Sequence, residues 1–129
     1  MTLAATTSAA AAAGVLALAG SGSVKVTLTA PGHTPKINVH WPYSVTVTRT
    51  GKPAAATVTA QIVDPIGGVH PVEFGKSTKN IVNWRFTGTF SDFIIWPPNS
   101  AVGLPLTFRL TVRSGGQTKV IAYQVTPKK

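Results

Sequence analysis

Apolar and polar residues alternate with a period of two along most of the chain after residue 23. The clearest case is the segment 106–113, whose apolar members are Leu106, Phe108, Leu110 and Val112. This pattern is typical of strands that bury one face and expose the other, as antiparallel sheets allow. No segment of 11 or more residues shows a convincing apolar repeat at helical spacing. The chain is therefore predicted to be all-β.

Turn residues divide this pattern into seven or eight short strands. We expect strands near 24–30, 37–48, 56–63, 69–74, 81–87, 89–96 and 105–113, and an eighth over 118–126. The stretch 81–96 also fits one bent strand with a kink at Gly88. The other inward residues are expected to be Val24, Val26, Leu28, Ala30, Val45, Val47, Val58, Ala60, Ile62, Ile121, Tyr123 and Val125. Connections this short cannot hold helical crossovers, so the strands are predicted to form an antiparallel β-sandwich.

The last two expected strands resemble the final hairpin of bacterial immunoglobulin-like or fibronectin type III-like modules. The resemblance rests on 104–112, on the Gly115-Gly116 turn and on 119–126, together with Gly51-Lys52-Pro53, which is similar to an early turn of these modules. It covers roughly 24–129 and implies an immunoglobulin-like β-sandwich in a small exported bacterial protein. It supplies no catalytic residues. Because the chain has 0 cysteines, apolar packing alone must hold the core.

The N-terminal segment has the composition of an export signal. Residues 1–23 carry no charge, and 9–19 form an apolar run of 11 residues that ends in Ala17-Leu18-Ala19. A signal-peptide core needs about 7–15 apolar residues and a membrane span about 20. We therefore expect a signal-peptide-like segment at 1–19, a Gly/Ser linker at 20–23 and one β-sandwich domain at 24–129. The mature protein is expected to be secreted or held at a bacterial cell surface, without a stable membrane span.

Two other interpretations of this segment stay open. Signal peptides normally open with Lys or Arg, and this chain has neither before Lys25. The true start codon could lie upstream of Met1. The segment could instead be an Ala/Thr-rich tail or an uncleaved anchor. A lipoprotein is rejected, because position 21 is a serine and offers no thiol for the lipid.

Catalytic and metal-binding patterns are absent from the sequence. The acidic residues are Asp64, Glu73 and Asp92, and the histidines are His33, His40 and His70. Their spacing matches no paired-carboxylate or metal-ligand pattern, and no nucleophile elbow or phosphate-binding loop is present. We expect no enzymatic activity, no metal and no cofactor. The alternative of a small exported enzyme would need a clustered acid or histidine site.

The charge balance points to an anionic partner. Lys and Arg number 12 against 3 acidic residues, for a net charge of +9. Arg109 and Arg113 are expected to share an outward face, with Lys119 just across the hairpin, and these three are the predicted polyanion-binding residues. The expected partner is an anionic cell-envelope polymer or another surface protein, although the charge could serve solubility alone. No aromatic-and-basic recognition motif is present, which argues against nucleic acid.

The large aromatic residues divide between core and strand ends. Trp84, Phe86 and Phe108 are expected in the core because they alternate with polar residues. Trp41 and Trp96 each precede a proline, at the expected end of a strand. Either they lid the open ends of the core, or they are exposed and stack on sugar rings. The leading hypothesis is a non-catalytic binding or structural module, and the alternative is a carbohydrate-binding module that uses Trp41 and Trp96.

Overall fold

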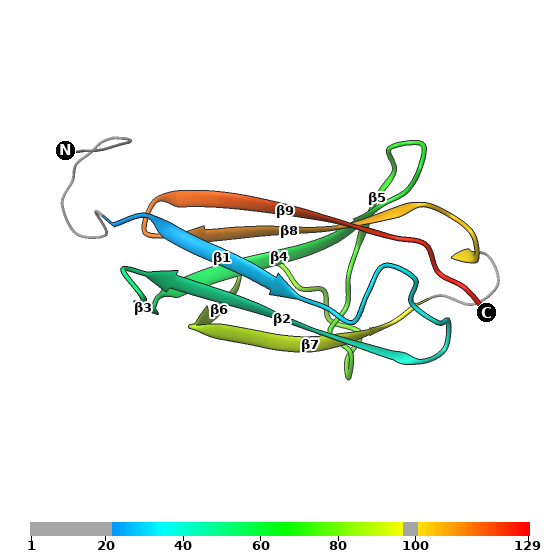
Figure 1. Ribbon diagram of the computed structural model, residues 1–129, viewed down its shortest axis with the longest axis horizontal. Coiled ribbons are helices and arrows are strands. Elements are labelled where there is room, and N and C mark those ends of the chain that lie inside the picture. The colour runs from blue at the N-terminus through cyan, green and yellow to red at the C-terminus, as the bar shows by residue number, and fades with distance from the viewer. Residues whose placement is uncertain (1–21, 97–100) are drawn as a thin grey trace.

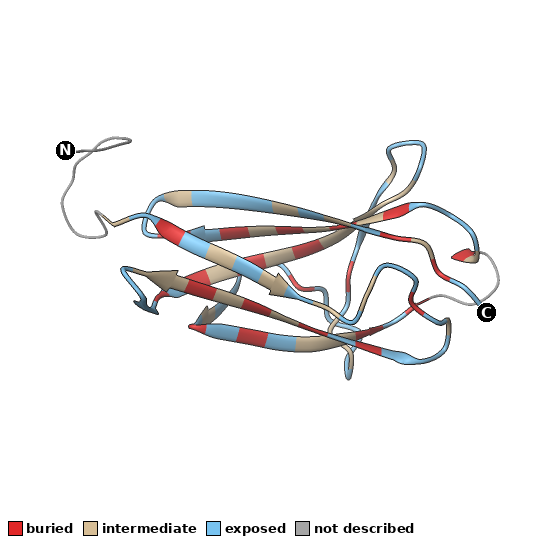
Figure 2. Ribbon diagram, viewed as in Figure 1, coloured by how far each residue is buried: buried red, intermediate tan, exposed pale blue. Residues whose placement is uncertain are grey.

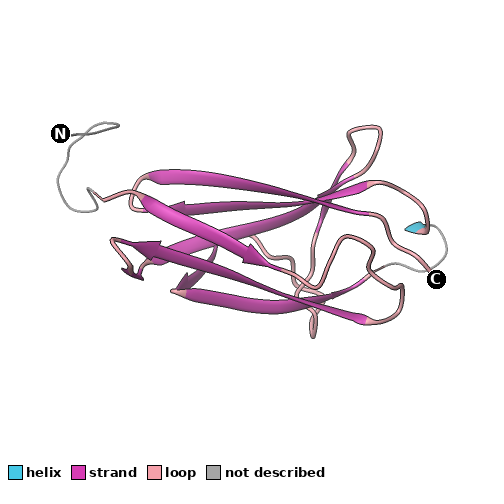
Figure 3. Cartoon of the chain, in the orientation of Figure 1, coloured by secondary structure: helices cyan, strands magenta, loops and turns pink. Residues whose placement is uncertain are grey.

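The computed structural model describes residues 22–96 and 101–129, which form two antiparallel sheets packed face to face (Figure 1). The predicted segment at 1–19 lies outside the described residues, as do the first two residues of the linker. The first sheet contains β1 (Val24–Thr29), β2 (His40–Arg49), β3 (Lys52–Pro53) and β7 (Thr89–Ile95). The second contains β4 (Ala55–Val63), β5 (Val69–Pro71), β6 (Trp84–Thr87), β8 (Leu106–Ser114) and β9 (Gln117–Val125). Strands and loops make up nearly all of the described chain (Figure 3).

The strand order is that of an immunoglobulin-like sandwich. In the first sheet β2 lies between β1 and β7, and in the second sheet β8 lies between β4 and β9. These strands correspond to A, B and E in one sheet and to C, F and G in the other. The predicted fold class is therefore confirmed. Within the described residues, no helix is long and apolar enough to cross a membrane.

The inward faces of the central strands agree with the alternation. Val45, Val47 and Val58 are completely buried, as are Phe108 and Leu110 on β8. Figure 2 shows the buried segments interrupted by less buried ones along β2, β4 and β8. Burial at every second position is what a strand between a core and solvent requires, because successive side chains point to opposite faces. The predicted register of these strands is confirmed.

The stretch 81–96 is not one bent strand. Gly88, with φ +78°, separates β6 from β7, and the two strands belong to different sheets. Its amide donates to the carbonyl of Ala54, which precedes β4, and its carbonyl accepts from the amide of Val47 on β2. A positive φ favours glycine, which has no Cβ to clash with the backbone. Gly88 therefore marks the point at which the chain changes sheets.

Trp84 is a second departure from expectation, because it is 42% exposed rather than part of the core. It lies opposite Val58, a buried residue, and so points to the inner side of its sheet. β6 pairs only with β4 and forms a sheet edge, where the opposite sheet covers its inner side incompletely. The Trp84 ring packs edge-to-face on Phe74 at 5.0 Å between centroids, and Lys79 Nζ lies 5.7 Å from its centroid.

Candidate functional site

The structure brings two of the three predicted polyanion-binding residues to one face and separates the third. Arg109 and Arg113 lie four positions apart on the outer face of β8, with Thr111 midway between them. Lys119 is exposed, but its cross-strand partner is Val112, which is buried in the core. Residues directly opposite each other in an antiparallel pair project from the same face. Lys119 therefore belongs to the inner side of β9, away from the two arginines.

Arg109 is engaged by a neighbour on the outer face. Its Nε and Nη2 donate to Gln61 Oε1 at 3.2 and 2.7 Å, and the residue is only half-exposed. Gln61 lies directly opposite Arg109 on β4, so the pair is a cross-strand contact of the kind that stabilises sheets. Arg109 is therefore less available to an external ligand than Arg113, which is exposed.

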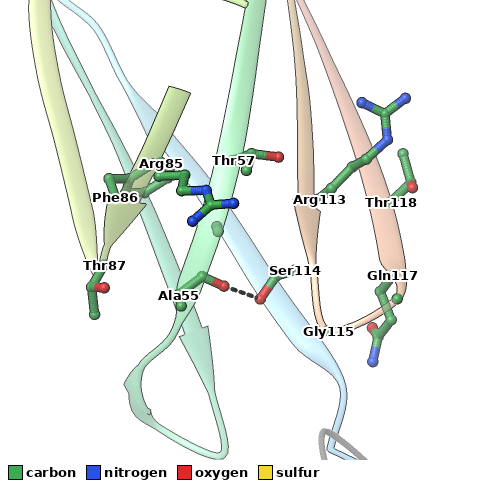
Figure 4. Close-up of a pocket in the computed structure, with 12 residues that line it drawn as sticks. Ala55, Thr57, Arg85, Phe86, Thr87, Arg113, Ser114, Gly115, Gln117 and Thr118 are labelled. Carbon is green, nitrogen blue, oxygen red and sulfur yellow. Dashed lines mark hydrogen bonds between the residues drawn. The ribbon is translucent and has the colours of Figure 1, made fainter. Parts of the chain in front are cut away.

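A groove lies on the outer face of the second sheet. Beside Arg113 it contains a second cation, Arg85, which is not among the residues predicted from the sequence. Thr57 lies opposite Arg113 on one side and opposite Arg85 on the other, so the three form one row across β8, β4 and β6. A hollow of about 730 Å³ lies over this row, between β6 and the β8–β9 hairpin (Figure 4). In Figure 4 the guanidinium of Arg85 extends from β6 over β4, on the side of Thr57. The groove therefore has an arginine on each flank.

The lining of this groove combines cations, hydroxyls and an apolar wall. Its described residues are Ala55, Ala56, Thr57, Arg85, Phe86, Thr87, Arg113, Ser114, Gly115, Gly116, Gln117 and Thr118. No carboxylate is among them. Arg113 Nη1 donates to Asn83 Oδ1 at 3.3 Å, a neutral acceptor that orients the guanidinium without neutralising it. Both arginines therefore keep their charge in the groove, because arginine stays protonated in proteins.

The hairpin that forms one side of the groove is fixed to the rest of the protein. Gly115 and Gly116, with φ values of +54° and +80°, form the two-residue turn, as the sequence predicts. Ser114 Oγ donates to the carbonyl of Ala55 at 2.6 Å (Figure 4). Arg49 of the first sheet donates from Nη2 to the carbonyl of Ser114 at 3.2 Å and from Nε to the carbonyl of Gly22. The hairpin is thereby tied to β4 and to the opposite sheet.

The groove lies at the end of the sandwich that concentrates the positive charge, which we call the basic end. Six of the 12 cationic residues lie there by strand register: Lys25, Arg49, Lys52, Arg85, Arg113 and Lys119. Figure 1 shows β3, β6 and the β8–β9 hairpin at this end, together with the start of β1. The acidic residues lie elsewhere: Asp64 after the far end of β4, Asp92 opposite Tyr43 and Glu73 opposite Asn80.

Of the two interpretations of Trp41 and Trp96, their burial favours the lid over the sugar platform. Trp41 is 4% exposed and Trp96 is 0% exposed. Their rings meet edge-to-face at 5.4 Å, and Trp41 Nε1 donates to the carbonyl of Gly32 at 3.2 Å. Trp41 lies on the inward side of β2, two residues before the buried Tyr43. Trp96 lies just after β7 and two residues after the buried Ile94. Neither indole face is available for stacking on a ring, and both close the core as lids.

The acidic and histidine residues lie in separate local contacts. Asp64 Oδ2 pairs with His70 Nε2 at 2.9 Å, and its Oδ1 accepts from the amides of Ile66 and Gly68. The hydrogen bond from His70, followed by that from Gly68, lowers the pKa of Asp64 below its ordinary value. His33 and His40 stack on Tyr123 and Phe93 at 4.2 and 4.0 Å. Within 22–96 and 101–129, no three metal-ligating side chains come together.

Comparison with known proteins gives structural likeness without a sequence family. No protein-family model matches the chain, and no curated protein matches it in sequence. The structure is similar to that of a DUF4426 family protein from Pseudomonas aeruginosa PAO1, with a TM-score of 0.46 and 20% identity, over 82% of this chain and 93% of that one. It is also similar to a DUF4466 family protein from Parabacteroides merdae ATCC 43184, with a TM-score of 0.46 and 13% identity, over 81% of this chain. The match spans 45% of the length of that second protein.

Proposed function

We propose that this protein is a non-catalytic, exported bacterial module of the immunoglobulin-like or fibronectin type III-like type, which holds an anionic cell-envelope polymer at its basic end. The observation that carries the proposal is the row of Arg85, Thr57 and Arg113 in a groove whose described lining has no carboxylate. Two unneutralised cations at one open site attract a polyanion, and the other cations of the basic end extend the field around the groove.

Export supports this choice of partner. The apolar run over 9–19, the Ala17-Leu18-Ala19 site and the Gly/Ser stretch after it fit a cleaved signal peptide. Outside the cytoplasm a basic protein meets envelope polymers before it meets nucleic acid. The described chain begins at Gly22, beside Arg49 and the hairpin, so the exported domain would carry its new N-terminus at the basic end. A further positive α-amino group would then add to the charge there.

The test is retention of the purified secreted protein on bacterial cell walls and on a neutral glucan, at low and high salt. We expect retention on walls alone, and we expect it to fall steeply as salt screens the charges, because the Debye length shrinks from about 10 Å at 0.1 M to about 3 Å at 1 M. The double variant Arg85→Gln with Arg113→Gln should lose most of this retention. Lys128→Gln with Lys129→Gln removes the same charge from the chain terminus and should retain most of it.

Two results would contradict the proposal. Equal loss in the two double variants would mean that net charge alone causes retention and that the groove has no special part. Absence of retention on walls at low salt would leave another surface protein as the partner and the charge as a source of solubility.

A further inference from the structure

We propose that the groove is a discrete site for a phosphate ester, specifically a phosphodiester that links hydroxylated carbon units. This inference rests on the proposed function and names the anionic group that the polymer would present. The shared chemistry is a phosphodiester next to alcohol carbons, whether the diester belongs to a polymer or to a lipid headgroup.

The first support is the placement of the two guanidinium groups. Arg85 and Arg113 come from the strands on either side of β4, so their Cα atoms lie two strand spacings apart, or about 10 Å. Thr57 lies between them on the same outer face. Figure 4 shows the Arg85 guanidinium directed toward β4 and that of Arg113, which donates to Asn83 Oδ1, directed away from Thr57. An anion over Thr57 would therefore meet Arg85 and the Thr57 hydroxyl directly, and Arg113 once its side chain turns toward the row. That arrangement suits an anion with oxygens directed to several sides.

Phosphate meets this requirement better than carboxylate does. The oxygens of a phosphate diester point in tetrahedral directions, so two of them can each accept from a different arginine. A carboxylate is planar, and one arginine fork can satisfy both of its oxygens, as bidentate pairs show. The second arginine would then have no acceptor. Both flanking cations are arginine and not lysine, and the rigid arginine fork matches phosphate geometry as well as carboxylate geometry.

The rest of the lining suits an ester of a polyol rather than a free inorganic anion. Ala55 lies on the same outer face as the row of cations, and Ala56 and Phe86 line the hollow from the inner side of their strands. Thr87 and Thr118 supply hydroxyl groups around the rim, whereas the Gln117 amide is bonded to the backbone of Val24 and Gly22. Carbon units on either side of a phosphodiester would pack against the first set, while their hydroxyl groups would meet the second. The groove is open along its length, so a chain could enter and leave it.

The hairpin side of the groove is held in place before any ligand binds. Ser114 bonds to Ala55, and Arg49 bonds to the Ser114 carbonyl. Groups that are already ordered lose less conformational entropy on binding, which favours affinity. On a diffuse basic surface, by contrast, the ligand must order the long side chains that bind it.

The experiment is a titration of the secreted protein with a short poly(glycerol phosphate) chain, followed by ³¹P NMR and calorimetry. An oligogalacturonate with the same number of charges is the carboxylate control. We expect saturable binding of the phosphate chain and weak, non-saturating binding of the carboxylate chain. Vesicles that contain phosphatidylglycerol present a related diester on a membrane and distinguish the lipid source from the polymer source.

Four variants distinguish binding at a discrete site from attraction by the overall positive charge. Arg85→Gln and Arg113→Gln should each weaken binding roughly tenfold to a hundredfold, the range expected for loss of charged hydrogen bonds. Arg85→Lys keeps the charge and should also weaken binding clearly, because it lacks the fork. Arg109→Gln removes a charge from the same sheet face, outside the groove, and should change the affinity by less than about threefold, because Arg109 is bonded to Gln61 and does not line the groove. Thermal unfolding of each variant controls for the fold.

The outcomes distinguish this inference from the proposed function. Equal affinity for the two oligomers, or an Arg85→Lys variant as good as the native protein, would overturn the phosphate site and leave polyanion binding intact. Arginine-dependent binding to vesicles but not to the soluble chain would keep the phosphate site and overturn the polymer as partner. Absence of binding to all three probes would overturn both.

Discussion

Arg49 Nη2 donates a hydrogen bond to the carbonyl of Ser114 at 3.2 Å and thereby joins β2 of the first sheet to the hairpin of the second. The same side chain donates from Nε to the carbonyl of Gly22, so one guanidinium connects three segments that are distant in sequence. Gly115 is required beside it, because a Cβ at this position would collide with the guanidinium and its φ of +54° already favours glycine. Arg49 therefore supports the groove from outside it.

The first prediction concerns this support. Arg49→Ala should lower the free energy of unfolding by about 1–3 kcal/mol, because two backbone carbonyls lose a charged donor. Amide hydrogen exchange at 115–118 should accelerate as well. Lys52→Ala removes a charge directly opposite Arg49 and should change stability by less than about 0.5 kcal/mol, as exposed surface changes do. Equal effects of the two substitutions would show that Arg49 acts by charge and not by its bonds.

A second prediction concerns the register of β8. Leu110 is fully buried, while Thr111 lies half-buried on the outer face. Leu110→Ala should lower the free energy of unfolding by about 2–5 kcal/mol, from lost transfer energy and a new cavity. Thr111→Ala should cost less than about 1 kcal/mol. Denaturant unfolding of both variants is the measurement, and a larger loss in the threonine variant would contradict the assigned faces.

A third prediction concerns processing. Signal peptidase is expected to cut after Ala19, so the intact mass of the secreted protein should correspond to a chain that begins at Gly20. Ala19→Leu puts a large side chain where the peptidase requires a small one, and it should leave the precursor uncut. A protein that keeps Met1 and stays in the cytosol would contradict export and remove the main reason for an envelope partner.

The alternation of apolar and polar residues predicted which side chains of a strand point inward. It did not predict which strands pair with each other. Within a strand, a period of two determines which side chains point inward, so the burial of Leu110 follows from its own segment. Arg85 lies between Trp84 and Phe86, a pattern that marks it as outward-facing. That Arg85 lies beside Thr57 depends on the pairing of β6 with β4, which no local pattern encodes.

Strand ends and sheet edges are where the burial of an aromatic residue is hardest to predict from the sequence. Trp84 has the alternation of a core residue, but β6 is an edge strand and leaves the indole partly exposed. Trp41 precedes a proline, which suggested an open strand end. Its two-residue spacing from Tyr43 was the better signal, because it places Trp41 on the buried side of β2. Burial at such positions depends on how far the opposite sheet extends, and the sequence of one strand does not contain that information.

A fourth prediction concerns a polar atom in the core. The hydroxyl of Tyr43 is buried and has no hydrogen-bond partner among the described residues. A buried hydroxyl without a partner costs about 1–3 kcal/mol of desolvation, so Tyr43→Phe should leave the stability unchanged or raise it by about 1 kcal/mol. Tyr43→Ala, which removes the ring from its edge-to-face contact with Phe108 at 4.9 Å, should cost about 3–5 kcal/mol. Denaturant unfolding at neutral pH compares the three proteins. A loss above about 1 kcal/mol in the phenylalanine variant would show that the hydroxyl does have a partner in the folded protein.

The last prediction concerns the same tyrosine and the pH dependence of the free energy of unfolding. Burial, and secondarily the negative charge of Asp92 on the neighbouring strand, raise the pKa of Tyr43 well above its ordinary value. Between the unfolded pKa, about 10, and the raised folded pKa, the native state binds more protons than the unfolded state, so stability must fall as the pH rises. The free energy of unfolding should therefore be insensitive to this group below pH ~9 and should decline above pH ~10. Tyr43→Phe removes the ionising group and should decline less steeply over the same interval. Urea unfolding from pH 8 to pH 11 measures the two slopes, and parallel curves would contradict the burial of Tyr43 as the cause.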